Sequence, residues 1–228
     1  MRIRLDDAGI DEARKAIAES VEEARRELDS LDAVREQLIK LSREVIRESG
    51  RSIVEIHKGN FDTAKGHLEV CEERALSMIR LASSKPQLLY TGLVNNALSE
   101  YVEAKLLYSL AAEGRLPPLR ELAGLGVPLV PYLQGLGDLV GELKRLSLEL
   151  IREGDYEQAW RLLSIAEAVY LELQSLDYPD ALIPGVRRKA DVARKVVDDL
   201  KGLLIDLSKR EELANLLRKA LEGLDRPA

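Results

Sequence analysis

The sequence has few aromatic residues, the type that fills the interior of many β-sandwiches and β-barrels: they make up only 4% of its 228 residues. The hydrophobic residues, 46% of the chain, are mostly Leu, Ala, Val and Ile, and a further 32% of the chain is charged. Leu, Ala, Glu, Arg and Lys, which fill much of the sequence, are strong helix formers. The composition therefore predicts an all-α protein. The length and the continuous helical pattern predict a single domain over residues 1–228.

Three further features that the sequence lacks indicate the compartment in which the protein is expected. Cys71 is the single cysteine, so no disulfide can form within the chain, and this fits a reducing compartment. The N-terminal stretch MRIRLDDAGIDEARK has no apolar segment typical of a secretion signal. No run of about 18 apolar residues could span a membrane. We therefore expect a cytoplasmic protein with no membrane partner.

The chain also lacks the excess of basic residues that is typical of nucleic-acid-binding proteins, because its formal net charge is −6. Binding to a nucleic acid would therefore depend on a local basic patch. Asp191, Asp198 and Asp199 interrupt the best candidate segment, so a mixed, solvent-exposed helix face is an equally good interpretation. The basic residues of this segment are Arg187, Arg188, Lys189, Arg194, Lys195 and Lys201.

Apolar residues repeat every seven positions through the first fifty residues, from Ile10 and Ile17 to Leu38 and Val45. This heptad pattern predicts one long N-terminal helix with a seam for other helices. Proline, glycine and serine clusters divide the rest of the chain into further helices. The Gly- and Pro-rich segment 113–131 is expected to be a long connection with at most one short turn. The seven expected helices cover approximately residues 1–50, 61–82, 87–112, 132–152, 156–176, 186–207 and 209–224, followed by a frayed tail at 225–228.

The stretch NNALSEYVEAKLL, at residues 95–107, places two carboxylates, Glu100 and Glu103, one turn apart on a nearly apolar helix. Downstream, the stretch GLGDLVGELKR places Asp138 and Glu142 four residues apart. Residues at these spacings share one face of a helix. Burying carboxylates together is costly unless a positive charge neutralises them. Their oxygen atoms suit a hard cation such as Mg²⁺ or Mn²⁺.

Three glycines lie close to Asp138 in the sequence: Gly135, Gly137 and Gly141. Glycine within a helix costs about 1 kcal/mol relative to Ala, so three of them suggest that another group approaches the backbone closely there. However, carboxylates at helical spacing are also common on solvated faces. Lys144 and Arg145 follow the second acidic pair, so a surface ion-pair patch is the alternative to a metal site.

The two acidic stretches resemble motifs of the translin family in their order and separation. LSEYVEA and YLQGLGDLVGELKR are similar to its catalytic branch, translin-associated factor X, and flanking segments extend the resemblance to residues 30–205. The resemblance implies a seven-helix bundle that binds single-stranded RNA or DNA and assembles into hollow octamers, here homo-octamers. It also implies an Mg²⁺-dependent endoribonuclease. The family's metal-binding and catalytic acids match Glu100, Glu103 and Asp138, with Glu142 alongside, whereas translin itself lacks the aspartate.

The reaction that the resemblance implies is metal-assisted hydrolysis, in which in-line attack on phosphorus leaves a 5′-phosphate and a 3′-hydroxyl. Neither histidine is close to the acids in the sequence, and His57 is explained as a last-turn residue that interacts with the helix dipole. Arg145 is expected either to contact phosphate or to pair with Glu142 or Glu149. Lys65 lies in a segment that resembles a nucleic-acid-contacting region of translin.

Three alternative functions are compatible with parts of the sequence. A translin-like protein could bind single-stranded RNA or DNA without cutting it, although the presence of Asp138 argues for the cleaving branch. An all-α nucleoside triphosphate pyrophosphohydrolase also uses helical carboxylate pairs, but its second motif is typically ExxD, whereas this chain has DxxxE. A ferritin-like di-iron protein would need Glu-x-x-His pairs, and none accompanies these acids.

Overall fold

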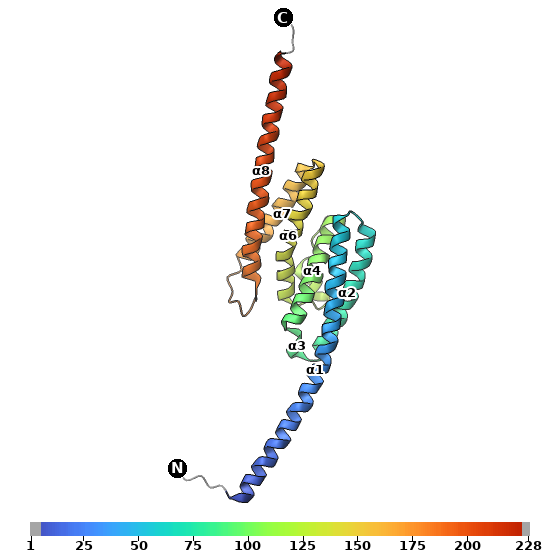
Figure 1. Cartoon of the computed structure of the whole chain (residues 1–228), viewed down its shortest axis with the longest axis vertical. Helices are drawn as coiled ribbons and strands as arrows, with labels where there is room; N and C mark the ends of the chain where they lie inside the picture. The colour runs from blue at the N-terminus through green and yellow to red at the C-terminus, as the bar shows by residue number, and fades with distance from the viewer. Residues whose placement is uncertain (1–5, 225–228) are drawn as a thin grey trace, which may run out of the picture.

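The computed structural model describes residues 6–224, which form eight helices and no strand (Figure 1). The all-α prediction is therefore confirmed for this part of the chain. Within residues 6–224, no helix combines the length and the apolar character needed to cross a bilayer. The helices are α1 (Asp7–His57), α2 (Phe61–Ser83), α3 (Pro86–Leu89), α4 (Gly92–Glu113), α5 (Leu119–Gly124), α6 (Leu129–Glu153), α7 (Tyr156–Gln174) and α8 (Val186–Leu224).

The predicted helix boundaries are wrong in two places. The expected helices at 186–207 and 209–224 form the single helix α8, because Ser208 does not interrupt the backbone. Its Oγ atom instead donates a 2.8 Å hydrogen bond to the carbonyl oxygen of Leu204, one turn earlier. The helix expected at 87–112 is instead divided into α3 and α4 between Leu89 and Gly92. The short helix α5 lies in the connection expected at 113–131. The predicted frayed tail at 225–228 lies outside the described residues.

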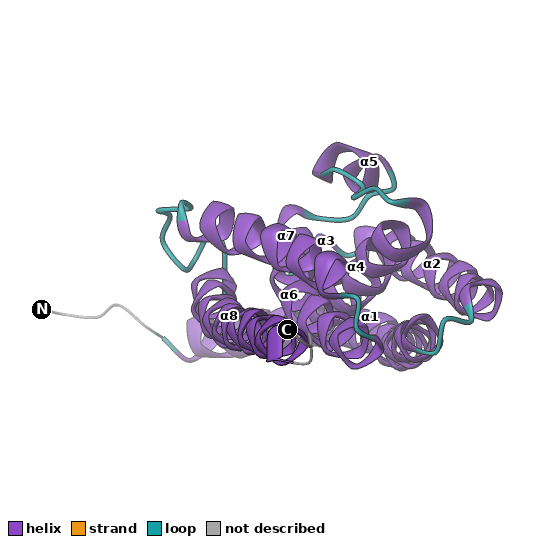
Figure 2. Cartoon of the chain, turned by 90° about the horizontal axis from the view of Figure 1, so that it is seen from above, coloured by secondary structure: helices purple, strands orange, loops and turns teal. Residues whose placement is uncertain are grey.

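The helices α4 and α6 lie at the centre of the bundle. α4 packs against α1, α2 and α6, and α6 packs in addition against α7 and α8. Figure 2 shows α2 and α8 on opposite sides of the molecule, with α4 and α6 between them. Tyr101, Leu139 and Leu143 are fully buried at this centre. Polar side chains on the facing surfaces of α4 and α6 are therefore largely removed from solvent.

The two longest helices, α1 and α8, extend beyond the bundle at opposite ends of the molecule (Figure 1). The heptad residues of α1 are fully buried where the helix lies in the bundle, at Leu38 and Val45. In the extension, Ile17 and Leu28 are 64% and 63% exposed. The heptad pattern therefore predicts the helix correctly, but only the later part of its apolar seam is covered within this chain.

Two of the three glycines of α6 mark close contacts between helices. A Cβ atom at Gly135 would lie 2.7 Å from the backbone oxygen of Ser99 on α4. A Cβ atom at Gly137 would lie 2.8 Å from the Cβ atom of Lys189 on α8. The predicted close approach is confirmed at these two positions, whereas a Cβ atom at Gly141 would meet open space among the described residues. The two contacts hold α6 against both α4 and α8.

Candidate functional site

Four carboxylates lie close together where α4 packs against α6. α4 contributes Glu100 and Glu103, and α6 contributes Asp138 and Glu142. Burial raises the pKa of Glu103 to about 8, together with repulsion from the other three carboxylates. Repulsion of this kind requires the charges to be near neighbours. Glu100 and Asp138 also line the same hollow, so acids from both helices lie at this junction.

Two glutamates of α4, Glu100 and Glu103, have no ion-pair partner among the described residues. Glu103 is only 8% exposed. Among residues 6–224, no side chain donates a hydrogen bond to Glu100 or Glu103 or forms an ion pair with either. Burial and the negative charge of Asp138 also raise the pKa of Glu100, against the opposing charge of Lys189. Buried carboxylates are usually paired, so these two favour either protonation or the arrival of a cation.

Asp138 is paired with a lysine from a third helix. The Lys189 ammonium group on α8 donates a short hydrogen bond to Oδ1 of Asp138. The side chains of Lys189 and Asp138 are 37% and 24% exposed, so the contact lies at the edge of the buried site. Lys189, which the sequence suggests as a nucleic-acid contact, is therefore held inside the acidic site rather than presented with the other basic residues of α8.

Glu142 is held by a histidine that sequence reasoning does not connect with it. Nε2 of His57 lies 2.5 Å from Oε2 of Glu142, and the guanidinium group of Arg145 lies 3.8 Å from the same oxygen. The other ring nitrogen of His57, Nδ1, is buried without a partner among the described residues. His57 therefore does more than interact with the dipole of α1. Because it lies 85 residues from Glu142, no local sequence pattern could have identified the contact.

A hollow of about 420 Å³ opens onto the acids. Its lining includes Glu100, Asp138 and Lys189, together with the polar side chains of Asn96 and Gln134. The more deeply buried Glu103 does not line it. The hollow therefore gives an incoming group access to one carboxylate of α4 and one of α6, at the point where Lys189 now lies.

The four carboxylates suit a divalent cation in chemistry and in burial. They supply the hard oxygen ligands that Mg²⁺ and Mn²⁺ prefer, and two of them lack any compensating charge contact. As they stand, no three Asp, Glu, His or Cys side chains within residues 6–224 converge closely enough to ligate one ion. Asp138 is directed toward Lys189 and Glu142 toward His57. The donor set therefore fits a divalent cation if these two contacts open.

The remaining predicted nucleic-acid contacts are spread over the surface. Arg145 is 56% exposed beside Glu142, so it is next to the acids. Arg187 is exposed on α8, where its guanidinium group lies 3.9 Å from Asp177. Lys65, on α2, is 60% exposed and lies 4.0 Å from Glu69. Arg188 and Arg194 are also exposed on α8. Of the predicted basic residues, the described contacts connect only Arg145 and Lys189 with the four acids.

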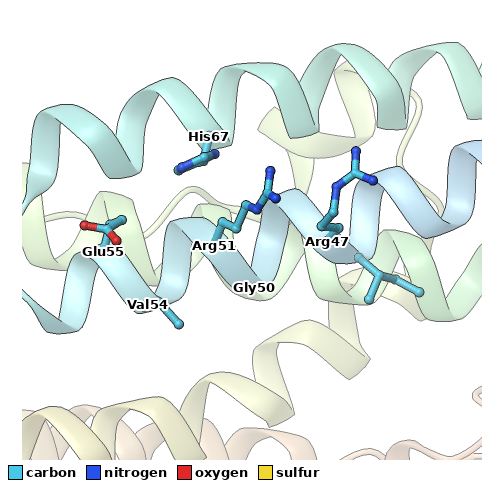
Figure 3. A pocket seen from close by; sticks show the side chains of 7 residues that line it. Arg47, Gly50, Arg51, Val54, Glu55 and His67 are labelled. Atoms are coloured by element: carbon cyan, nitrogen blue, oxygen red, sulfur yellow. The ribbon is translucent and has the colours of Figure 1, made fainter.

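A second charged cluster, which the sequence does not suggest, lies between α1 and α2 around Glu48. Nε of Arg47 and Nη1 of Arg51 each lie 3.0 Å from Oε1 of Glu48, and Nδ1 of His67 lies 2.8 Å from Oε2. Figure 3 shows Arg47 and Arg51 rising from α1 toward His67 of α2, at a hollow of about 660 Å³. Burial alone would raise the pKa of Glu48, but these three partners lower it below the ordinary value.

Comparison with known proteins identifies relatives over most of the chain. The profile of the Translin family matches residues 33–211. An uncharacterized protein of Methanocaldococcus jannaschii is 29% identical over 198 residues, which are 86% of each chain. Translin-associated protein X of Mus musculus is 25% identical over 183 residues, which are 64% of this chain and 63% of the mouse protein.

Two solved structures share the fold. The AfC3PO–duplex RNA complex superposes with a TM-score of 0.73 at 32% sequence identity, covering 84% of this chain and 97% of that chain. The crystal structure of apo-NeC3PO superposes with a TM-score of 0.71 at 25% identity, covering 81% and 95%. The matched residues 33–211 include the four acids and all of α4 and α6. The chain belongs to the translin family.

Proposed function

We propose that this protein is an Mg²⁺-dependent endoribonuclease, with Mn²⁺ able to replace Mg²⁺, that cleaves single-stranded RNA within a hollow homo-octamer. The observation that carries the proposal is Glu103, a carboxylate that is only 8% exposed and whose pKa is raised by burial and by repulsion from three other carboxylates. Such a set is unfavourable by itself and becomes favourable when a cation joins it. Strongly perturbed carboxylates next to a hollow are also typical of functional sites.

Glu100, Glu103, Asp138 and Glu142 would hold the cation. When bound, it supplies Lewis acidity toward the scissile phosphate and the attacking water. Because the pKa of Glu103 is raised to about 8, its carboxyl group carries a proton at neutral pH in the metal-free protein. That proton must leave before Glu103 can act as a ligand. Hydrolysis by in-line attack would leave a 5′-phosphate and a 3′-hydroxyl.

The neighbouring side chains have supporting roles in this proposal. His57, through Nε2, fixes the orientation of the Glu142 carboxylate. Arg145 lies beside Glu142 with more than half of its side chain exposed, so it can contact a phosphate of a bound RNA. Arg187, Arg188, Arg194 and Lys65 are candidates for more distant phosphate contacts. These contacts are needed because the net charge of the chain is −6.

RNA as the substrate is supported by the relatives. AfC3PO, which shares the fold at 32% identity, was solved in complex with duplex RNA. The resemblance of the acidic motifs to translin-associated factor X indicates single-stranded RNA. The two sources differ in the strandedness of the nucleic acid, so both forms belong in the test.

The decisive experiment is cleavage of end-labelled single-stranded and duplex RNA by the purified protein with Mg²⁺, with EDTA and with Asp138→Asn. We expect cleavage of the single strand that is lost with EDTA and reduced at least roughly 100-fold by Asp138→Asn. Glu113→Gln, an exposed change on α4, is the matched control and should retain full activity. Full activity of Asp138→Asn, or activity in EDTA, would remove the four acids from the mechanism.

A non-catalytic binding protein is the second candidate function, favoured by one observation. Asp138 and Glu142 are already held by Lys189 and His57, as in a structural ion-pair cluster. RNA binding without metal-dependent cleavage would support this candidate. Release of pyrophosphate from a nucleoside triphosphate would instead indicate the pyrophosphohydrolase alternative.

A further inference from the structure

Lys189 is a cation from α8 inserted into a site built by α4 and α6. Its ammonium group bonds Asp138, and its positive charge also opposes the upward pKa shifts of Glu100 and Glu103. It therefore compensates part of the negative charge of three of the four carboxylates. This is the electrostatic contribution that a bound divalent cation would make.

The backbone around Lys189 fixes this position. A Cβ atom at Gly137, the residue before Asp138, would lie 2.8 Å from the Cβ atom of Lys189, so α6 and α8 touch here. The side chain of Lys189 therefore begins close to Asp138, within reach of the Asp138 carboxylate. The packing of α6 against α8 consequently positions Lys189 at the site, and its contact with Asp138 is not an incidental surface ion pair.

The side chain of Lys189 can also leave Asp138 without unfolding the site. It is 37% exposed, and it lines the hollow that contains Asn96 and Gln134. A lysine ammonium is a compact charge on a flexible stem, and the hollow offers polar atoms and solvent to receive it. Movement into this space would free Oδ1 of Asp138 for another cation.

We propose that Lys189 is a tethered internal cation that competes with the divalent metal for Asp138, so that metal binding requires the ammonium group to move away. The inference rests on the proposed metal site and adds a positioning residue to it. Lys189 holds the site in a charge-compensated state without metal, and it thereby sets the metal concentration at which the site fills.

The test is direct titration of the metal-free, full-length protein with Mn²⁺ in the absence of RNA, by calorimetry or by electron paramagnetic resonance of free Mn²⁺. We expect Lys189→Met to bind Mn²⁺ roughly tenfold more tightly than the unaltered protein, or about 1.4 kcal/mol. Lys189→Gln, which keeps a polar group, should behave in the same direction and serves if the first variant does not fold.

Lys144→Met is the matched control, because it removes a similar charge between the same two helices. Nζ of Lys144 on α6 lies 3.1 Å from Oδ2 of Asp199 on α8, and the lysine side chain is 30% exposed. Its Mn²⁺ affinity should stay within about twofold of the unaltered protein, since a pair outside the site contributes little. In an Asp138→Asn background, Lys189→Met should no longer tighten binding, because the contested carboxylate is gone.

Unchanged or weaker Mn²⁺ binding by both Lys189 variants overturns the inference, and cleavage by the unaltered protein would leave the proposed function standing. Equal tightening by Lys144→Met and Lys189→Met also overturns it, because the effect would then reflect net charge rather than competition for Asp138. If neither the unaltered protein nor any variant binds Mn²⁺, both the proposed metal site and the proposed competition by Lys189 are wrong.

Discussion

Glu48 and Glu103 are two glutamates with little exposed surface, 6% and 8%, in one helical bundle, and their pKa values shift in opposite directions. Arg47, Arg51 and His67 surround Glu48 and lower its pKa despite burial. Glu103 has three carboxylates for neighbours, and burial with their repulsion raises its pKa to about 8. Burial alone therefore does not determine the direction in which the pKa of a carboxyl group shifts, because the shift also depends on the charged groups around it.

The Glu48 carboxylate stabilises the fold, whereas the fold leaves the charge of the Glu103 carboxylate largely uncompensated. The cluster around Glu48 is complete within the chain and links α1 to α2. The cluster around Glu103 is less compensated, because among the described residues only Lys189 opposes the upward shift of its pKa. A site that lacks positive charge is the one suited to take a cation from solution.

The comparison is tested most strongly by the same substitution in both places. Glu48→Gln should lower the free energy of unfolding by about 2 kcal/mol, because Arg47 and Arg51 lose the negative charge with which they pair. Glu103→Gln should raise it by roughly 1 kcal/mol at pH 8 without metal, because it removes a buried charge. Urea unfolding followed by circular dichroism measures both. Destabilisation of similar size in both variants would show that the two glutamates contribute to stability in the same way.

The two histidines provide a smaller test. His57→Gln should lower the rate of RNA cleavage roughly tenfold, because Glu142 loses the group that orients it. His67→Gln should leave the rate within about twofold, since its partner Glu48 lies in the other cluster. Single-turnover cleavage assays at saturating Mg²⁺ measure the difference. Equal losses in both variants would mean that the α1–α2 cluster also supports the reaction.

A further expected effect is on the pH dependence of stability in the metal-free protein. Because the pKa of Glu103 is raised from 4.5 to about 8, the folded protein keeps a proton that the unfolded chain releases, so stability falls as the pH rises across this interval. The lowered pKa of Glu48 has the opposite consequence: its contribution is present above pH 4.5 and is lost as the pH falls through the folded-state value.

Thermal melts between pH 4 and pH 9 measure both slopes. We expect the melting temperature to fall by about 2–4 °C for each 1 kcal/mol lost toward high pH. Glu103→Gln should flatten the alkaline side of the profile, and Glu48→Gln should flatten the acid side. A profile of the Glu103→Gln protein that still falls toward pH 8 would assign the loss to other groups.

Much of the fold could be predicted from local sequence. The heptad repeat predicts α1, and the spacing of Glu100 and Glu103 predicts a shared helix face, because helical periodicity is a property of neighbouring residues. The prediction fails at Ser208, where a serine can end a helix or, as here, bond back to the preceding turn. Neighbouring residues alone do not decide between these outcomes.

The partners of the acids could not be predicted in the same way. His57 reaches Glu142 across 85 residues, and Lys189 reaches Asp138 across 51. The contact of Lys189 depends on the close approach of α8 to α6 at Gly137, and the contact of His57 depends on α1 and α6 both packing against α4. The cluster of Glu48 with His67 of α2 was missed for the same reason.

The sequence by itself determined the helical class of this protein, the pairing of its acids on two helix faces and the family motifs that they form, because these depend on spacing along the chain. Tertiary structure decided which charges meet. It gave Glu48 three partners that lower its pKa and left Glu103 among carboxylates, because only packing sets the distance between side chains from different helices and removes them from water.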